Sequence, residues 1–322
     1  MKDKYILTAE SVTAGHPDKL CDTIADSILD ACLKDDPNAR VACEVLATVG
    51  KILVAGELRT TANPDVEAIV RQVVRNSGYD CNYHVEVRLH TQSPDIAGAV
   101  DGDTLGAGDQ GIMYGYACWE TVELLPAPVV LANRITSLLT TCREEKLISG
   151  IGPDGKAQVS VQYAFGVPER VDTIVISCQH DADKDPDELR EELRRLVIAR
   201  ACHDVRIDEN TKIFINPSSR FVLGGFEADT GLTGRKLMVD TYGGLAPHGG
   251  GALSGKDGTK VDRSGAYMAR YVAKNIVAAG LADVCTVSLA YAIGQAEPVA
   301  VEIDTQESGY YDDAFLTEAV RR

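Results

Sequence analysis

The chain has 322 residues, of which 45% are hydrophobic, so it is long enough for two or three domains with buried cores. Its net charge of −16 excludes non-specific binding to nucleic acid or to anionic lipid surfaces, because both are polyanions. Nine scattered cysteines without a C-x-x-C pair favour a reducing cytoplasm over a disulfide framework. No apolar run is long enough for a membrane span, so we expect a cytoplasmic protein with no membrane partner.

The first motif in the chain, GHPDK at residues 15–19, stands at the start of a predicted helix. Apolar residues recur with helical spacing over 20–29, and Pro17 fits the first turn. His16 then falls at the N-cap, where a histidine faces anions, and Asp18 in the first turn offers a carboxylate to a metal ion. Both residue types are also common as plain helix-start signals, and the motif alone leaves that alternative open.

The same order of strand, turn, strand, loop and helix occurs three times. Strand pairs are predicted at 39–61, 156–180 and 283–306, each followed by a helical pattern. The spacing of about 120 residues predicts an α+β fold of three related α/β units in a pseudo-threefold arrangement, with their sheets packed on one another. We place the units at 1–105, 106–220 and 221–322; chance recurrence of common elements is the alternative.

Two features of the first unit carry possible chemistry. Glu44 and Glu57 interrupt otherwise apolar strands, where a glutamate either faces solvent or needs a cation or an amine partner. Residues 92–111 combine glycines and aspartates without any period and predict a long loop, the kind of segment that often covers or binds a ligand.

A glycine-rich segment at 231–263 is locally basic within this acidic chain. It holds five Lys or Arg against three Asp, and 250–256 satisfy the phosphate-loop pattern G-x-x-x-x-G-K. Asp257 stands where a phosphate loop has Ser or Thr, and two residues intervene before the next helix. Backbone N–H groups of a glycine run together with Lys256 still suit a polyphosphate. A glycine-rich turn is the alternative.

That next helix is predicted to begin near Val261 or Asp262. An aspartate at this position is commonly a cap. Beside a phosphate loop, Asp262 is also a good magnesium ligand, because hard cations bind carboxylate and phosphate oxygens together.

Six segments in order resemble the methionine adenosyltransferase, or S-adenosylmethionine synthetase, family. They are GHPDK, GAGDQG at 106–111, GLTGRK at 231–236, DTYGG at 240–244, HGGGALSGKD at 248–257 and KVDRSGAY at 260–267. The resemblance runs from Leu7 to about Glu302. It implies synthesis of S-adenosylmethionine from ATP and L-methionine, by attack of the methionine sulfur on the 5′ carbon of ATP, followed by hydrolysis of the triphosphate.

The resemblance also implies a role for each matching residue. The implied catalytic residues are His16, Lys156, Arg235, Lys236 and Lys256. The implied ATP-binding residues are these five together with Asp154, Gly155, Arg220, Phe221, Asp229 and Ala252. Methionine would contact Glu57, Gln92, Asp229 and Lys260. Asp18 and Asp262 would each bind one of two Mg²⁺ ions, and Glu44 would bind K⁺. The family places its active site between two subunits, so a homodimer is implied, possibly paired into a dimer of dimers.

The sequence departs from the family pattern in two places. The chain ends at Arg322, where family members usually continue through a further helical segment, and the stretch between Tyr79 and Gln92 is shorter than usual. Two other functions remain open at this stage. A P-loop ATPase or kinase would require Ser or Thr after Lys256, and an inactive nucleotide-binding relative would have lost the charged residues that are all present here.

Overall fold

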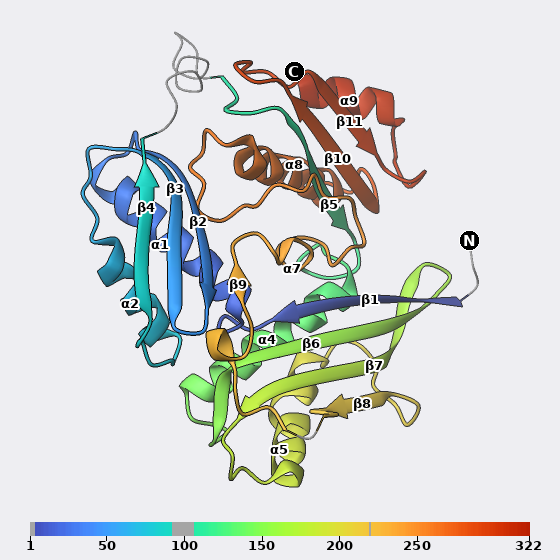
Figure 1. The fold of residues 1–322 in the computed structure, drawn as a ribbon. Helices are drawn as coiled ribbons and strands as arrows, with labels where there is room; N and C mark the ends of the chain where they lie inside the picture. The colour runs from blue at the N-terminus through green and yellow to red at the C-terminus, as the bar shows by residue number, and fades with distance from the viewer. Residues whose placement is uncertain (1–3, 92–105, 219) are drawn as a thin grey trace.

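The structure is a computed structural model that describes residues 4–91, 106–218 and 220–322. It shows a mixed α/β fold with three sheets, each covered by its own helices (Figure 1). The predicted loop at 92–111 lies largely outside the described residues, and so does Gln92.

The largest body of the fold is a sheet of two long strands and two shorter ones. Its order is β1-β6-β7-β8, and helices cover one face. The strands are β1 (Lys4–Val12), β6 (Ile151–Ala164), β7 (Val167–His180) and β8 (Lys212–Ile215). The helices are α4 (Ala127–Glu144), α5 (Pro186–Leu193), the π-helical turn η1 (Arg194–Ile198) and α6 (Ala199–Ala201).

A second sheet has the order β4-β3-β2-β9 and packs on two helices. Its strands are β2 (Arg40–Thr48), β3 (Lys51–Arg59), β4 (His84–His90) and β9 (Gly231–Leu232). The helices are α1 (Pro17–Asp35) and α2 (Val66–Asn76). Helix α1 turns its apolar side, from Leu20 through Ile24 to Ile28, into this core, which leaves its other face to the functional segments described below.

The third sheet has the order β11-β10-β5. Its strands are β5 (Gly111–Cys118), β10 (Val284–Tyr291) and β11 (Ala300–Asp304), and its helices are α8 (Val261–Ala278) and α9 (Asp313–Arg321). The remaining short elements are η2 (Gly225–Glu227), which contacts β2, and α7 (Leu237–Asp240), which contacts β1. Helix α8 begins at Val261, as the sequence predicts.

The three sheets exchange strands in a cycle, which the sequence did not predict. Strand β1, from the first segment of the chain, pairs with β6 of the second; β5, from the second, pairs with β10 of the third; and β9, from the third, pairs with β2 of the first. Such a cyclic exchange fits a pseudo-threefold relation among the units. It also ties each unit to the next through backbone hydrogen bonds.

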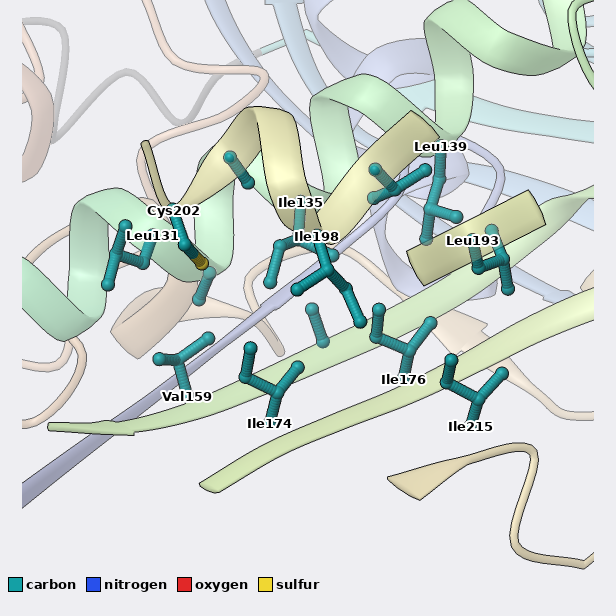
Figure 2. Packing of buried hydrophobic residues seen from close by; sticks show 14 of the residues in the cluster. Leu131, Ile135, Leu139, Val159, Ile174, Ile176, Leu193, Ile198, Cys202 and Ile215 are labelled. Atoms are coloured by element: carbon teal, nitrogen blue, oxygen red, sulfur yellow. The ribbon is translucent and has the colours of Figure 1, made fainter. Parts of the chain in front are cut away.

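The core of the first of these sheets lies between its long strands, β6 and β7, and the helices that cover it (Figure 2). Ile174 and Ile176 of β7 point from the sheet towards Ile135, Leu193 and Ile198 of the covering helices. All five side chains are buried, and Ile176 is fully so. Helix α5 begins with Pro186 in its first turn, and the Asp185 carboxylate caps two backbone N–H groups.

Truncating this core is expected to destabilise the protein strongly. Ile176→Ala should lower the free energy of unfolding by about 3 to 4 kcal/mol, because it removes buried methyl groups and leaves a cavity. Urea unfolding followed by circular dichroism would measure the change. The matched control is Ile6→Ala, since Ile6 is half-exposed on β1 and should lose less than about 1 kcal/mol. Equal losses for the two variants would contradict this assignment of the core.

Candidate active site

The N-terminus of α1 presents His16 as its N-cap residue. The imidazole Nδ1 accepts a hydrogen bond from the backbone N–H of Asp18 at 3.2 Å, so the proton of the neutral ring is on Nε2. Burial, reinforced by the nearby Lys236 ammonium, lowers the pKa of His16 to about 4. The ring is therefore a neutral hydrogen-bond donor near pH 7.

Asp18, in the first turn of the same helix, is buried among cations. Its carboxylate accepts hydrogen bonds from the Leu232 backbone at 2.9 Å and from Lys236 Nζ at 2.6 Å, and Arg235 Nε lies 3.5 Å away. Burial by itself raises the pKa of Asp18, but the hydrogen bonds from Lys236 and Leu232 outweigh it and leave the pKa below its usual value. GHPDK and GLTGRK, more than 200 residues apart, thus form one charged unit.

A cavity of about 350 Å³ opens beside His16, at the ends of β6 and β7. Its walls come from α1, β6, β7 and the segment around 216–229. Residues implied by the resemblance make up much of the lining: His16, Asp154, Gly155, Lys156, Arg220, Phe221 and Asp229. Together with Asp18, Arg235 and Lys236, these residues are called the cavity cluster.

Three polar lining residues were missed by the sequence analysis: Ser177, Asn216 and Ser218. Asn216 has a positive φ of 42°, and its side-chain amide bonds both backbone groups of Cys178 at 2.8 and 2.9 Å. Asn tolerates this backbone conformation better than most residues. A lone Asn after a strand is too common in turns to be singled out from the sequence.

Asp154 holds two parts of the cavity wall together. Its Oδ2 atom accepts the Gly225 N–H at 2.9 Å, and the side chain is buried. Burial raises the pKa of Asp154 to about 6, and the Asp229 carboxylate contributes in the same direction. Lys156, two residues along β6, is half-exposed and pairs with Glu10 of β1 at 2.9 Å.

The raised pKa of Asp154 gives stability a specific dependence on pH. The pKa of this carboxyl is 3.8 in its ordinary state and about 6 in the folded protein. Its contribution to the free energy of unfolding is therefore intact below about pH 4 and is lost as the pH rises through 6. Asp154→Asn keeps an acceptor for Gly225 and should therefore be more stable than the parent by about 2 kcal/mol at pH 8. Urea unfolding from pH 4 to pH 8 should show this difference shrinking towards zero at the acid end. A difference that stays constant with pH would contradict the account.

The edge of β2 holds the predicted phosphate loop in place. Cys43 N–H donates to the Gly255 carbonyl at 2.9 Å, and Ala42 forms a β-bridge with Lys256. Asp257 is almost fully buried, and its carboxylate accepts the Val41 N–H at 2.7 Å and Lys260 Nζ at 2.5 Å. The residue that departs from the P-loop pattern thus anchors the loop to the sheet.

Lys256 and Asp262 meet at the end of this loop. Lys256 Nζ lies 2.7 Å from Asp262 Oδ2, and both side chains are partly buried. A Cβ on Gly251 would stand 2.1 Å from Asp262 Oδ1, so position 251 must be glycine for the carboxylate to lie against the loop backbone. Ala252, Lys256, Lys260 and Asp262 are called the loop cluster.

Helix α1 carries a row of aspartates that bonds the basic segments to the helix. Asp18 holds Leu232 and Lys236, as described above. Asp22 Oδ1 accepts the Gly234 N–H at 3.0 Å and the Ser254 hydroxyl at 2.5 Å. Asp26 Oδ1 accepts the Gly255 N–H at 2.9 Å and Arg263 Nη1 at 2.6 Å. Their spacing of four residues on one helix face was visible in the sequence but was not used.

The remaining predicted residues do not gather in the cavity. Glu44 is exposed on β2, which agrees with the first of the two alternatives for it, that its side chain faces solvent. Glu57 is half-exposed on β3, and its carboxylate lies 3.2 Å from His90 Nε2. Within the described residues, no hydrogen bond or ion pair joins a charged side chain of the cavity cluster to one of the loop cluster. The two clusters therefore share no direct bond between charged side chains, although Asp22 binds the backbone of Gly234 and the hydroxyl of Ser254, which adjoin them.

Cations fixed beside ionised carboxylates, next to a cavity of nucleoside size, define a class of protein that acts on a nucleoside triphosphate. Comparisons with known proteins agree. The chain matches the family descriptions "S-adenosylmethionine synthetase, N-terminal domain" over 4–102, "central domain" over 104–221 and "C-terminal domain" over 223–322. It is 48% identical to the S-adenosylmethionine synthase of Finegoldia magna over an alignment that covers 98% of this chain and 85% of that protein. The chain belongs to the S-adenosylmethionine synthetase family.

Among residues 4–91, 106–218 and 220–322, no helix is long and apolar enough to cross a bilayer. The same residues contain no group of three or more His, Cys, Asp or Glu side chains that could hold a metal ion. A metal ion held by Asp18 or Asp262 would need further oxygen ligands from a substrate or from water, which is how Mg²⁺ is commonly bound.

Proposed function

We propose that this protein synthesises S-adenosyl-L-methionine from ATP and L-methionine and then hydrolyses the released triphosphate to phosphate and pyrophosphate. Membership of the family supports the reaction. The observation that carries the proposal for this chain is the cavity, where Phe221, Arg220 and Lys156 stand beside the neutral ring of His16. An adenine ring can stack on an aromatic face, and fixed cations stabilise a chain of phosphates.

In the proposed reaction, the methionine sulfur attacks the 5′ carbon of ATP and the C5′–O bond breaks. Sulfur needs no deprotonation, so the step requires no general base. The triphosphate oxygen takes the electron pair of the broken bond, and charge grows there in the transition state. The Nε2–H of His16 can donate to this oxygen, because Nδ1 is held by Asp18. Lys156, Arg235, Lys236 and Lys256 would neutralise the phosphates, with Ala252 contributing loop backbone.

The nucleoside part of ATP would occupy the cavity, with Asp154, Gly155, Arg220 and Phe221 around it. Methionine would lie near Asp229, Glu57, Lys260 and Gln92, where carboxylates answer its ammonium group. Gln92 lies outside the described residues, so this part rests on the resemblance. The family's enzymes depend on metal ions.

Asp18 and Asp262 fit two Mg²⁺ ions. Each carboxylate pairs with a lysine, Asp18 with Lys236 and Asp262 with Lys256. A bound ion would neutralise phosphate charge as the triphosphate leaves. Glu44 is our candidate for K⁺; its exposed carboxylate on β2 is open to a ligand from outside the chain.

We propose a homodimer, possibly paired into a dimer of dimers, in which the cavity cluster of one copy faces the loop cluster of the other. Among the described residues no ion pair joins the charged side chains of the two clusters within one chain, and this supports the arrangement. The charged groups that act on His16 are Lys236, Asp18, Lys156 and Asp229, all of the cavity cluster. The free, mostly buried cysteines suit a reducing cytoplasm.

The test is an incubation of the purified protein with ATP, methionine, Mg²⁺ and K⁺, in which S-adenosylmethionine is followed by chromatography. Methionine-dependent product supports the proposal. ATP hydrolysis that is equally fast without methionine would instead indicate an ATPase, and nucleotide binding without turnover would indicate an inactive relative.

Phe221→Ala should raise the ATP KM about tenfold by removing the aromatic face. An unchanged KM would contradict the placement of adenosine in the cavity.

A further inference from the structure

His180, the last residue of β7, is bonded to the cavity wall through both its backbone and its side chain. Its N–H donates to the Phe221 carbonyl at 2.8 Å, and its ring Nε2 accepts the Phe221 N–H at 3.1 Å. The residue is 6% exposed. Both backbone polar groups of Phe221 are therefore satisfied by one histidine, which does not itself line the cavity.

The protonation state of this ring is set by its second nitrogen. Nδ1 lies 2.8 Å from the Asp181 carbonyl, which can only accept a hydrogen bond. The proton is therefore on Nδ1, and the lone pair of Nε2 is free to accept the Phe221 N–H. A side chain without an acceptor at this place would leave the partly buried N–H of Phe221 without this partner.

The neighbouring residue, Gln179, forms hydrogen bonds to two segments of the cavity wall, one at Val222 and the other at Asp154. Its Nε2 donates to the Val222 carbonyl at 3.1 Å, and its Oε1 accepts the Asp154 N–H at 3.0 Å. Both Gly152 and Gly224 pass so close that a Cβ on either would stand 2.5 Å from the Gln179 amide carbon. Two consecutive residues at the end of β7, Gln179 and His180, thus hold the backbone of Val222 and Phe221.

We propose that His180 is a positioning residue for the nucleoside half of ATP. It acts through Phe221, holding the aromatic ring and the adjacent Arg220 at the cavity. The inference deepens the proposed function and rests on it, because it assumes that adenosine binds beside Phe221. Its loss weakens binding of the nucleoside and leaves the chemistry at the triphosphate intact, since the loop that carries the loop cluster is held by α1 and β2 instead.

The experiment compares His180→Leu, which removes the acceptor, with His180→Gln, whose amide oxygen can replace Nε2. Two reactions are measured for each: S-adenosylmethionine synthesis from ATP, and hydrolysis of inorganic triphosphate, which has no nucleoside. His180→Leu should raise the ATP KM about tenfold, and His180→Gln should return it to within about threefold of the parent. Hydrolysis of inorganic triphosphate should stay within about twofold for both. His203→Leu is the control, because His203 is exposed and bonds only a helix carbonyl.

The outcomes distinguish a failure of the proposed function from a failure of the role given to His180. No S-adenosylmethionine from the parent refutes the proposed function. An ATP KM that responds to Phe221→Ala but not to His180→Leu overturns the inference alone. Equal losses in both reactions also overturn it, because they indicate a general loss of structure. If His180→Leu does not fold, His180→Asn replaces it: this side chain can still bond Asp181 but is too short to reach Phe221, so the same rise in KM is expected and an unchanged KM refutes the inference.

Discussion

Replacing Lys256 with alanine is expected to lower the kcat of S-adenosylmethionine synthesis by about a hundred- to a thousandfold. The substitution removes a cation from the end of the phosphate loop and leaves the Asp262 carboxylate, its partner at 2.7 Å, without a counter-charge. Because charge on the triphosphate grows as the C5′–O bond breaks, the loss falls on the transition state more than on ATP binding. Steady-state kinetics with saturating methionine would separate kcat from KM.

The control for this variant is Lys51→Ala. Lys51 also forms an ion pair with a carboxylate, Glu86, but this pair joins β3 to the edge strand β4. Its removal should leave kcat within about twofold, since surface ion pairs contribute little. Activity of Lys256→Ala and Asp262→Ala within threefold of the parent would refute the roles given to the loop cluster.

Asp22→Ala is expected to impair both activity and stability. One carboxylate oxygen of Asp22 holds Gly234 and Ser254, so its loss frees the segments that carry Lys236 and Lys256 and leaves buried donors unpaired. We expect kcat to fall about a hundredfold and the free energy of unfolding to fall by about 2 to 3 kcal/mol. Asp22→Asn retains an oxygen acceptor and should recover most of the lost kcat.

Helix α1 provides the control for this second variant. Asp30 lies on the same face, eight residues after Asp22, but it is exposed and bonds neither segment. Asp30→Ala should therefore leave kcat unchanged when both variants are assayed together. A similar fall in kcat for Asp22→Ala and Asp30→Ala would show that the negative charge of the helix face matters, rather than the two hydrogen bonds.

The sequence predicted local features of the fold well. Helical periodicity with Pro17 and His16 placed the start of α1, and the start of α8 was predicted near Val261 or Asp262. It missed the exchange of β1, β5 and β9 between sheets, because pairing of distant strands depends on tertiary packing and leaves no local pattern.

The candidate site was predicted unevenly for the same reason. Motifs with unusual chemistry, such as GHPDK and the glycine-rich loop, were found from the sequence. Residues that act by holding others, such as His180, Gln179 and Asn216, were not, because their roles depend on which backbone group lies opposite them. Asp257 shows the reverse case: as a departure from the P-loop pattern it was noticed, but its bond to Val41 appears only in the folded chain.

The central claim is that the cavity cluster and the loop cluster of different copies act on one ATP. The most direct test is a hybrid dimer purified through two different tags, with Arg235→Ala in one copy and Lys256→Ala in the other. Each variant alone should be nearly inactive. A site shared between copies gives the hybrid one intact site, and so about half of the parent's activity per dimer. A hybrid as inactive as either variant would contradict the claim, since a site built within one chain would then be damaged in both copies.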